Sequence, residues 1–215
     1  YCIAPLRPDA ISLAALQAQS LLDAGKYTER DFAEVAVRSR RDAKDNPNAQ
    51  VTGDFSVDEI LDSPYIASPL RKHDCPPISD GGAAMVIATA DKAKELCERP
   101  VWIRSIDHRI EAHQPGLRNL AVSTSTRQAA EKCGVKGDKI DVAEVYAPYT
   151  HQELILRDAL GLAESVSLNP SGGALAAHPL MSAGLIRIGE VANRIMSGKA
   201  DRGLAHATSG SCLQH

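Results

Sequence analysis

Three absences narrow the function of this chain: it has no surplus of either charge, no long apolar run and no paired cysteines. Its 24 basic and 27 acidic side chains leave a net charge of −3, and they contain no block of Lys or Arg. The electrostatic footprint of nucleic-acid or membrane-surface binding is therefore missing. No apolar run approaches the roughly 20 residues that cross a bilayer, so we expect no membrane span.

The five cysteines are scattered along the chain, and no C-x-x-C pair occurs among them. This pattern disfavours a disulfide framework and a structural zinc site, and we expect no bound metal. The first residues, Tyr1-Cys2-Ile3-Ala4-Pro5, lack the charged and apolar regions of a signal peptide. We therefore expect a cytoplasmic protein.

The first third of the chain has the pattern of a helical, loop-rich and exposed region. Leucines recur at helical spacing between residues 9 and 24 and predict a first helix there, before Gly25. Segments 28–31 (Thr-Glu-Arg-Asp) and 56–59 (Ser-Val-Asp-Glu) are typical of capped helix starts. We therefore expect a second and a third helix after them.

From residue 79 onward, apolar runs alternate with amphipathic segments. A small, glycine-bearing turn leads into the run 83–88 (Ala-Ala-Met-Val-Ile-Ala), which predicts a buried strand. The predicted strands are 83–88, 101–106, 141–145 and 203–207, and the predicted helices are 91–97, 124–133 and 150–160. Such alternation predicts an α/β domain with a largely parallel sheet.

Two strand-to-helix junctions are candidates for one shared site, because α/β folds place sites at the carboxyl ends of strands. The first is 146–149 (Tyr-Ala-Pro-Tyr), between a predicted strand and its capped helix. The second runs from Asn169 through Gly172 and Gly173 to His178. Paired glycines allow a ligand to approach the backbone closely, and a histidine on such a loop titrates near neutrality.

Structural interpretations compete with the functional ones. Tyr146 also fits a packed ring with a satisfied hydroxyl, and His151, in the first turn of its helix, is expected to be solvated. His73-Asp74-Cys75 has the composition of a nucleophilic site, but neighbours in sequence seldom face one another, so packing is favoured. A basic cluster consists of Arg38, Arg40 and Arg41. It could hold phosphates, although an ordinary solvated helix face is favoured.

Several motifs resemble the thiolase family and occur in that family's order. Residues 169–173 (Asn-Pro-Ser-Gly-Gly), followed by His178-Pro179 and Ala183-Gly184, resemble the thiolase N-P-S-G-G, G-H-P and T-G block. Residues 78–84 (Ile-Ser-Asp-Gly-Gly-Ala-Ala) resemble the thiolase D-G-A-A strand. The resemblance covers essentially the whole chain.

A closer resemblance lies in residues 32–37 (Phe-Ala-Glu-Val-Ala-Val), Asn46-Pro47, Ala49 and 68–71 (Ser-Pro-Leu-Arg). They are similar to the loop domain of the thiolases of sterol carrier protein-x and their bacterial relatives, often labelled lipid-transfer proteins. The resemblance implies an α/β thiolase fold, a layered αβαβα arrangement with mixed, mainly parallel sheets, plus a helical loop domain. It implies a fragment without the N-terminal half, which carries the nucleophilic cysteine, and without the final strand. The implied domains are 1–78 (loop domain and connection to the core), 79–100 (last strand and helix of the N-terminal half) and 101–215 (C-terminal half).

Departures from the thiolase pattern point to altered chemistry. His178 matches the histidine of G-H-P, but Tyr146 stands where thiolases have the Asn of N-E-A-F, or this subfamily the His of H-D-C-F. Pro148 replaces the subfamily's cysteine, and Gly210 ends a Thr-Ser-Gly segment where thiolases have C-x-G. Neither location offers a thiol for proton transfer, which argues against Claisen condensation and thiolysis.

The resemblance implies an enzyme that makes or breaks a C–C bond in an acyl-CoA thioester, of acyltransferase or retro-aldol type. Relatives with Tyr at this position include aldolases that shorten steroid side chains, which points to sterol or lipid side-chain degradation. Tyr146 and His178 would be acid/base or oxyanion-polarising groups, and the backbone N–H of Gly210 would donate in an oxyanion hole.

The same resemblance implies binding residues and partners. Ser171, Gly172 and Gly173 would bind and shape the site of the coenzyme A thioester, which is a substrate, and no tightly bound cofactor is expected. A homodimer and a small OB-fold partner protein are implied. Two alternatives remain: a non-catalytic thiolase-like protein that binds or transfers lipids or acyl-CoA, and a purely structural subunit.

Overall fold

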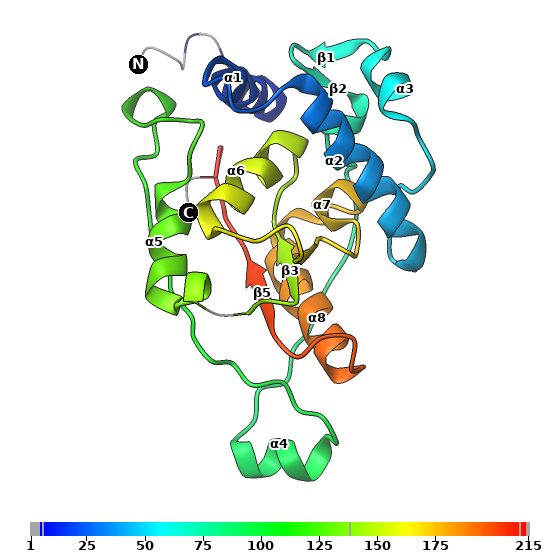
Figure 1. Cartoon of the computed structure of the whole chain (residues 1–215), viewed down its shortest axis with the longest axis vertical. Helices are drawn as coiled ribbons and strands as arrows, with labels where there is room; N and C mark the ends of the chain where they lie inside the picture. The colour runs from blue at the N-terminus through cyan, green and yellow to red at the C-terminus, as the bar shows by residue number, and fades with distance from the viewer. Residues whose placement is uncertain (1–4, 6, 138, 211, 214–215) are drawn as a thin grey trace.

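Three parallel strands form the central sheet in the computed structural model of the chain (Figure 1). The structure describes residues 5, 7–137, 139–210 and 212–213, so residues 1–4, on which the signal-peptide expectation rests, lie outside it. β3 (Val142–Val145) is fully buried between β4 (Ser167–Leu168) and β5 (Gly203–His206). Both neighbours run parallel to β3. The carboxyl ends of the strands therefore meet at one edge of the sheet, the usual place for a site.

Helices of the C-terminal part surround this sheet. α8 (Ala183–Met196) packs on β3 and β5, and α5 (Thr124–Cys133) packs on α6 (Thr150–Leu160). The short α7 (Gly173–Ala176) follows β4, and all four of its residues are buried. The predicted α/β class, with a parallel sheet, is confirmed. So are the helices expected at 124–133 and 150–160 and the strands expected at 141–145 and 203–207, within a residue or so at each end.

The first third is helical, as the capping signals predict. It forms α1 (Ala10–Asp23), α2 (Glu29–Asp42), α3 (Val57–Leu61) and a small hairpin of β1 (Tyr65–Ala67) and β2 (Leu70–Arg71). Capping boxes start α2 at Thr28 and α3 at Ser56. The expectation that this third is exposed is wrong for its inner faces, because Ala18 and Phe32 belong to the same buried cluster as Ile155 of α6.

The buried strand expected at 83–88 and the strand expected at 101–106 are absent from the described residues. Both segments are irregular, and Val86 (93% exposed) and Ile103 (65% exposed) face solvent. They are the two extended arms that connect α4 (Ala90–Leu96), at one end of the molecule, to the rest (Figure 1). A strand forms only when a neighbouring edge satisfies its backbone, and no described strand lies beside either arm.

Membrane-spanning character is likewise missing from the described helices. None of them has both the length and the apolar composition that crossing a bilayer requires.

Candidate functional site

The two junctions singled out from the sequence meet at the carboxyl edge of the sheet. The Tyr146 hydroxyl lies 2.6 Å from Nε2 of His178, and the two rings stack with their centroids 5.5 Å apart. Tyr146 directly follows β3, and its backbone N–H donates to the carbonyl of His206 on β5. His178 follows α7, 32 residues later in the sequence. The structure thus pairs the two side chains, while their catalytic role stays a prediction.

The protonation states of the pair follow from its surroundings. Burial lowers the pKa of the His178 imidazole, and the positive charge of Arg187 lowers it further. Burial also raises the pKa of the Tyr146 phenol. At neutral pH the phenol therefore keeps its proton and the imidazole is uncharged. The phenol can then donate to Nε2, which leaves the imidazole proton on Nδ1.

The backbone of His178 is held by a polar contact from a distant segment. Its N–H donates to Oγ of Ser79 at 3.0 Å, and the Ser79 hydroxyl donates to Oε1 of Gln50. The backbone N–H groups of Gln50 and Val51 both donate to the carbonyl of Ala176, at 3.0 and 3.1 Å. The position of His178 is therefore fixed through residues of the first third of the chain.

The same region of the chain also holds the segment 171–175. Ser39 on α2 donates to the carbonyl of Gly172 at 2.6 Å, and Asn46 donates to that of Ser171 at 3.0 Å. The Arg40 guanidinium donates to the carbonyl of Leu175. These contacts and those to Ala176 form the loop clamp, the set of donors from residues 39–51 that bind the carbonyls of 171–176. The clamp satisfies carbonyl groups that a four-residue helix cannot satisfy itself.

The paired glycines are explained by packing against protein. Gly172 has φ +85°, and a Cβ there would lie 2.6 Å from the Cβ atoms of Ala43 and Ala176. Gly173, at φ +64°, abuts the side chain of Asn169. Ser171 is 1% exposed. Protein atoms therefore fill the space beside both glycines. The expectation that this segment binds the thioester stays a prediction.

A buried ion pair beneath the site was missed by the sequence analysis. Arg187 on α8 lies 2.6 Å from Glu144 on β3, and both are almost completely buried. Ser171 binds Glu144 through its hydroxyl, at 2.8 Å, and its backbone N–H, at 3.0 Å. The available signal was a charged residue, Glu144, within the strand predicted at 141–145.

His151 is buried rather than solvated, contrary to expectation. It has no exposed surface, and Nε2 lies 3.2 Å from Oε1 of Gln17 on α1. Burial lowers its pKa to about 3, so the imidazole is neutral. The correction has a simple cause: the N-terminal turn of α6 is covered by α1, a helix 134 residues away in sequence.

The segment 73–75 packs against the rest of the protein, the interpretation that the sequence favoured over a nucleophilic site. Asp74 is 2% exposed and accepts from the backbone N–H of Arg71 and the hydroxyl of Thr150. Burial raises the pKa of the Cys75 thiol to about 12, so it is a poor nucleophile at neutral pH. Gly210 is exposed with φ +75°, and no interaction among the described residues joins it to the Tyr146–His178 pair.

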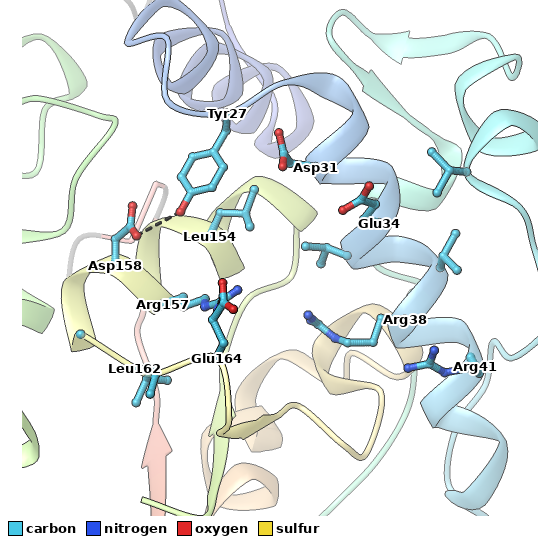
Figure 2. A pocket seen from close by; sticks show the side chains of 15 residues that line it. Tyr27, Asp31, Glu34, Arg38, Arg41, Leu154, Arg157, Asp158, Leu162 and Glu164 are labelled. Carbon is cyan, nitrogen blue, oxygen red and sulfur yellow. Dashed lines mark hydrogen bonds and ion pairs between the residues drawn. The ribbon is translucent and has the colours of Figure 1, made fainter. Parts of the chain in front are cut away.

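The basic cluster is divided between the interior and a surface groove. Arg40 is 2% exposed and serves the loop clamp, so the solvated interpretation is wrong for this residue. Arg38 and Arg41 line a groove of about 940 Å³ between α2 and α6 (Figure 2). Arg38 is paired with Glu153 and Arg41 with Asp42, so a carboxylate offsets the charge of each guanidinium. Tyr146 and His178 do not line this groove.

Comparisons with known proteins agree with this architecture. The family model described as "Thiolase, C-terminal domain" matches residues 102–214. The acetyl-CoA acetyltransferase of Methanothermobacter thermautotrophicus is 28% identical over 93% of this chain and 60% of its own length. The 17-hydroxy-3-oxo-4-pregnene-20-carboxyl-CoA lyase of Mycobacterium tuberculosis is 29% identical over 72% of this chain and 44% of its own length.

A solved structure is similar over nearly the whole chain. The "Ltp2-ChsH2(DUF35) aldolase" superposes with a TM-score of 0.80 at 21% identity, covering 96% of this chain and 62% of that one. This likeness is one of fold. The chain spans about 60% of the first of the two relatives above and less than half of the second.

Proposed function

The chain belongs to the thiolase family, whose C-terminal domain occupies residues 102–214, and from that premise we propose that it acts on acyl-CoA thioesters by making or breaking a C–C bond. The observation that carries the proposal is the 2.6 Å contact between Tyr146 and His178 at the carboxyl edge of the sheet. A protonated phenol bound to a neutral imidazole is an acid/base pair that can move a proton in either direction.

The retro-aldol direction has three steps, and this pair acts in the first and the last. The phenol oxygen of Tyr146 accepts the proton of a β-hydroxyl group while its own proton passes to Nε2 of His178. The Cα–Cβ bond of the β-hydroxyacyl thioester then breaks, giving a ketone or aldehyde and a thioester enolate. Return of the proton to the enolate carbon gives the shortened acyl-CoA and restores the pair. The backbone N–H of Gly210 is the proposed donor to the enolate oxygen.

The thiols of the chain are poorly placed for proton transfer, which favours the Tyr146 hydroxyl and the His178 imidazole as the groups that carry the proton. Pro148 and the segment 208–210 provide no thiol where cysteine chemistry would need one. Burial raises the pKa of Cys75 to about 12 and also raises that of Cys212, so both stay protonated at neutral pH. A retro-aldol or oxygen-based acyl transfer fits these facts better than thiolysis.

The proposal extends to the organisation of the whole protein. We assign residues 1–78 to the loop domain, 79–100 to the last strand and helix of an N-terminal half, and 101–215 to the C-terminal half. The exposed apolar arms on either side of α4 support this division, because large exposed apolar surfaces mark interaction sites. A homodimer and a small partner protein belong to the same proposal, and the similar aldolase structure carries two protein names, Ltp2 and ChsH2(DUF35).

Turnover of a β-hydroxyacyl-CoA by the full-length protein tests the function. Release of the shortened acyl-CoA, measured by mass spectrometry, should fall at least about tenfold in Tyr146→Phe and in His178→Ala, which is the lower range for an acid/base group. Tyr27→Phe is the matched control, because it removes a phenol hydroxyl that only binds Asp158 at the surface. Unchanged rates in both site variants would refute the proposal. Thermal stabilisation by acyl-CoA without any product would favour the alternative of a binding protein.

A further inference from the structure

Ser79 and Gly81 lie against the loop that carries His178. The Ser79 hydroxyl accepts from the backbone N–H of His178 at 3.0 Å. The carbonyl of Gly81 accepts from the hydroxyl of Ser182 at 3.2 Å. Between these two hydrogen bonds, a Cβ at Gly81 would lie 2.9 Å from Cβ of Pro179 and 3.0 Å from its Cγ. The contacts therefore reach His178 itself, the residue after it and the end of its loop.

The loop itself gives the backbone of His178 little local support. Ala177, the residue before it, is extended with φ −153° and ψ 130°, so the helical hydrogen bonds of α7 do not continue to His178. Pro179, the residue after it, has no N–H to donate. The N–H of His178 donates to Ser79, whose own proton goes to Oε1 of Gln50. The backbone of His178 is therefore held from outside its own loop.

The adjacent glycines Gly81 and Gly82 differ in what a side chain would meet. Neither has a φ in the left-handed region, so neither needs to be glycine for its backbone conformation. A Cβ at Gly82 would meet nothing within 4 Å, whereas a Cβ at Gly81 would collide with the Pro179 ring. The missing side chain at Gly81 therefore allows the close approach to Pro179. Because the proline ring is stiff, this contact sets the spacing between the two segments.

We propose that Ser79 and Gly81 are positioning residues that hold the His178 imidazole at hydrogen-bond distance from the Tyr146 hydroxyl. The inference rests on the proposed function for its catalytic meaning. Ser79 binds the His178 backbone, and Gly81, by having no side chain, lets Pro179 come close enough for that hydrogen bond to form. A proton passes between the phenol and the imidazole only at hydrogen-bond distance, so a displaced His178 backbone slows the reaction.

Neighbouring glycine variants of the full-length protein test the role of Gly81. In Gly81→Ala the new methyl group lies 2.9 Å from Pro179 and must retreat by about 0.5 Å to reach ordinary van der Waals contact. We expect kcat to fall about tenfold with KM little changed, since a misplacement of about 1 Å can cost about 100-fold. Gly82→Ala adds the same methyl group one residue later, in open space, and is the matched control.

A second pair of variants tests the hydrogen bond to the His178 backbone. Ser79→Ala removes the acceptor of the His178 N–H, so kcat should again fall about tenfold. Ser79→Thr keeps the hydroxyl, and its kcat should stay within about twofold of the wild type. Ser197→Ala is a further control, because the Ser197 hydroxyl binds only the carbonyl of Arg194 at the exposed end of α8.

The contact between the two rings is measured without turnover, from the nitrogen NMR signal of His178 Nε2 in protein that carries isotope-labelled histidine. His178→Asn assigns the signal, and Tyr146→Phe shows where it lies when no phenol donates to Nε2. The signal should move towards that position in Gly81→Ala and in Ser79→Ala. It should keep the wild-type position in the matched variants Gly82→Ala and Ser79→Thr.

A signal that keeps the wild-type position removes the substituted residue from the proposal, and in both Gly81→Ala and Ser79→Ala it overturns the inference. Equal falls in kcat in Gly81→Ala and Gly82→Ala would do the same for Gly81, because the contact with Pro179 would not be the cause. If the signals move as expected but the wild type releases no product from any β-hydroxyacyl-CoA, the proposed function fails and the positioning role stands. Should Gly81→Ala not fold, Ser79→Ala against Ser79→Thr decides alone.

Discussion

Replacing Gly172 by alanine should destabilise the protein well beyond the usual cost of losing a glycine. The residue lies in the left-handed region at φ +85°, which costs an alanine about 1–2 kcal/mol. Its new methyl group would also lie 2.6 Å from the methyl groups of Ala43 and Ala176, where neither neighbour can move without its backbone. Such overpacking adds about 1–3 kcal/mol. We therefore expect the free energy of unfolding to fall by about 2–5 kcal/mol.

Urea denaturation of Gly172→Ala and Gly161→Ala separates the two contributions. Gly161 ends α6 at φ +63°, and a methyl group there meets nothing within 4 Å, so this control variant carries only the backbone cost. The difference between the two variants should be about 1–3 kcal/mol. Equal losses of stability, within about 0.5 kcal/mol, would mean that packing against Ala43 and Ala176 is not what requires a glycine at this position.

Three further outcomes follow from the buried groups. Asn169→Ala should cost about 1–3 kcal/mol in urea denaturation, because it leaves the buried Val145 N–H without its acceptor and removes the donor to Oε2 of Glu153, which keeps its pairing with Arg38; a cost under about 0.5 kcal/mol would contradict this. His151 titrates at about 3 when folded, against about 6.5 when unfolded, so the unfolded chain binds protons first as pH falls. The free energy of unfolding should therefore decline from about pH 6.5 towards pH 3, by up to about 1.4 kcal/mol per pH unit. His151→Gln should make that decline shallower, and an equal pH dependence in the wild type and the variant would contradict the prediction. Under native conditions a maleimide should label the partly exposed Cys97 long before the buried Cys75, as peptide mass mapping can check.

Local signals in the sequence predicted much of the fold. Ser56 begins a helix because its hydroxyl accepts from the N–H of Glu59, and at Thr28 the Asp31 carboxylate accepts from the Thr28 N–H, contacts made within three residues. The alternation of strands and helices after residue 120 likewise predicted the parallel sheet. The arms at 83–88 and 101–106 show where prediction from local sequence fails. An apolar run becomes a strand only beside the edge of another strand, and its own sequence does not specify whether such an edge is present.

The site shows the same division between local and distant information. Tyr146 and His178 were found because each follows a strand or helix end, where side chains of α/β folds converge. The burial of His151 and Arg40 and the pairing of Glu144 with Arg187 depend on partners 33 to 135 residues away. No pattern within one segment specifies such a partner, so the sequence alone misplaced the first two and left the third unseen.

The loop clamp has a consequence for the order in which the molecule assembles. Its hydrogen bonds join residues separated by 125 to 135 positions, from Asn46–Ser171 to Arg40–Leu175. These contacts can form only after a loop of that length has closed, whereas the hydrogen bonds of a helix join residues four positions apart, so we expect the clamp to form after the helices. A polypeptide emerging from the ribosome therefore has its helices long before it has a Tyr146–His178 pair in working geometry. We therefore expect the site to form late in folding, and to be lost early in unfolding when α2 detaches from the segment 171–176.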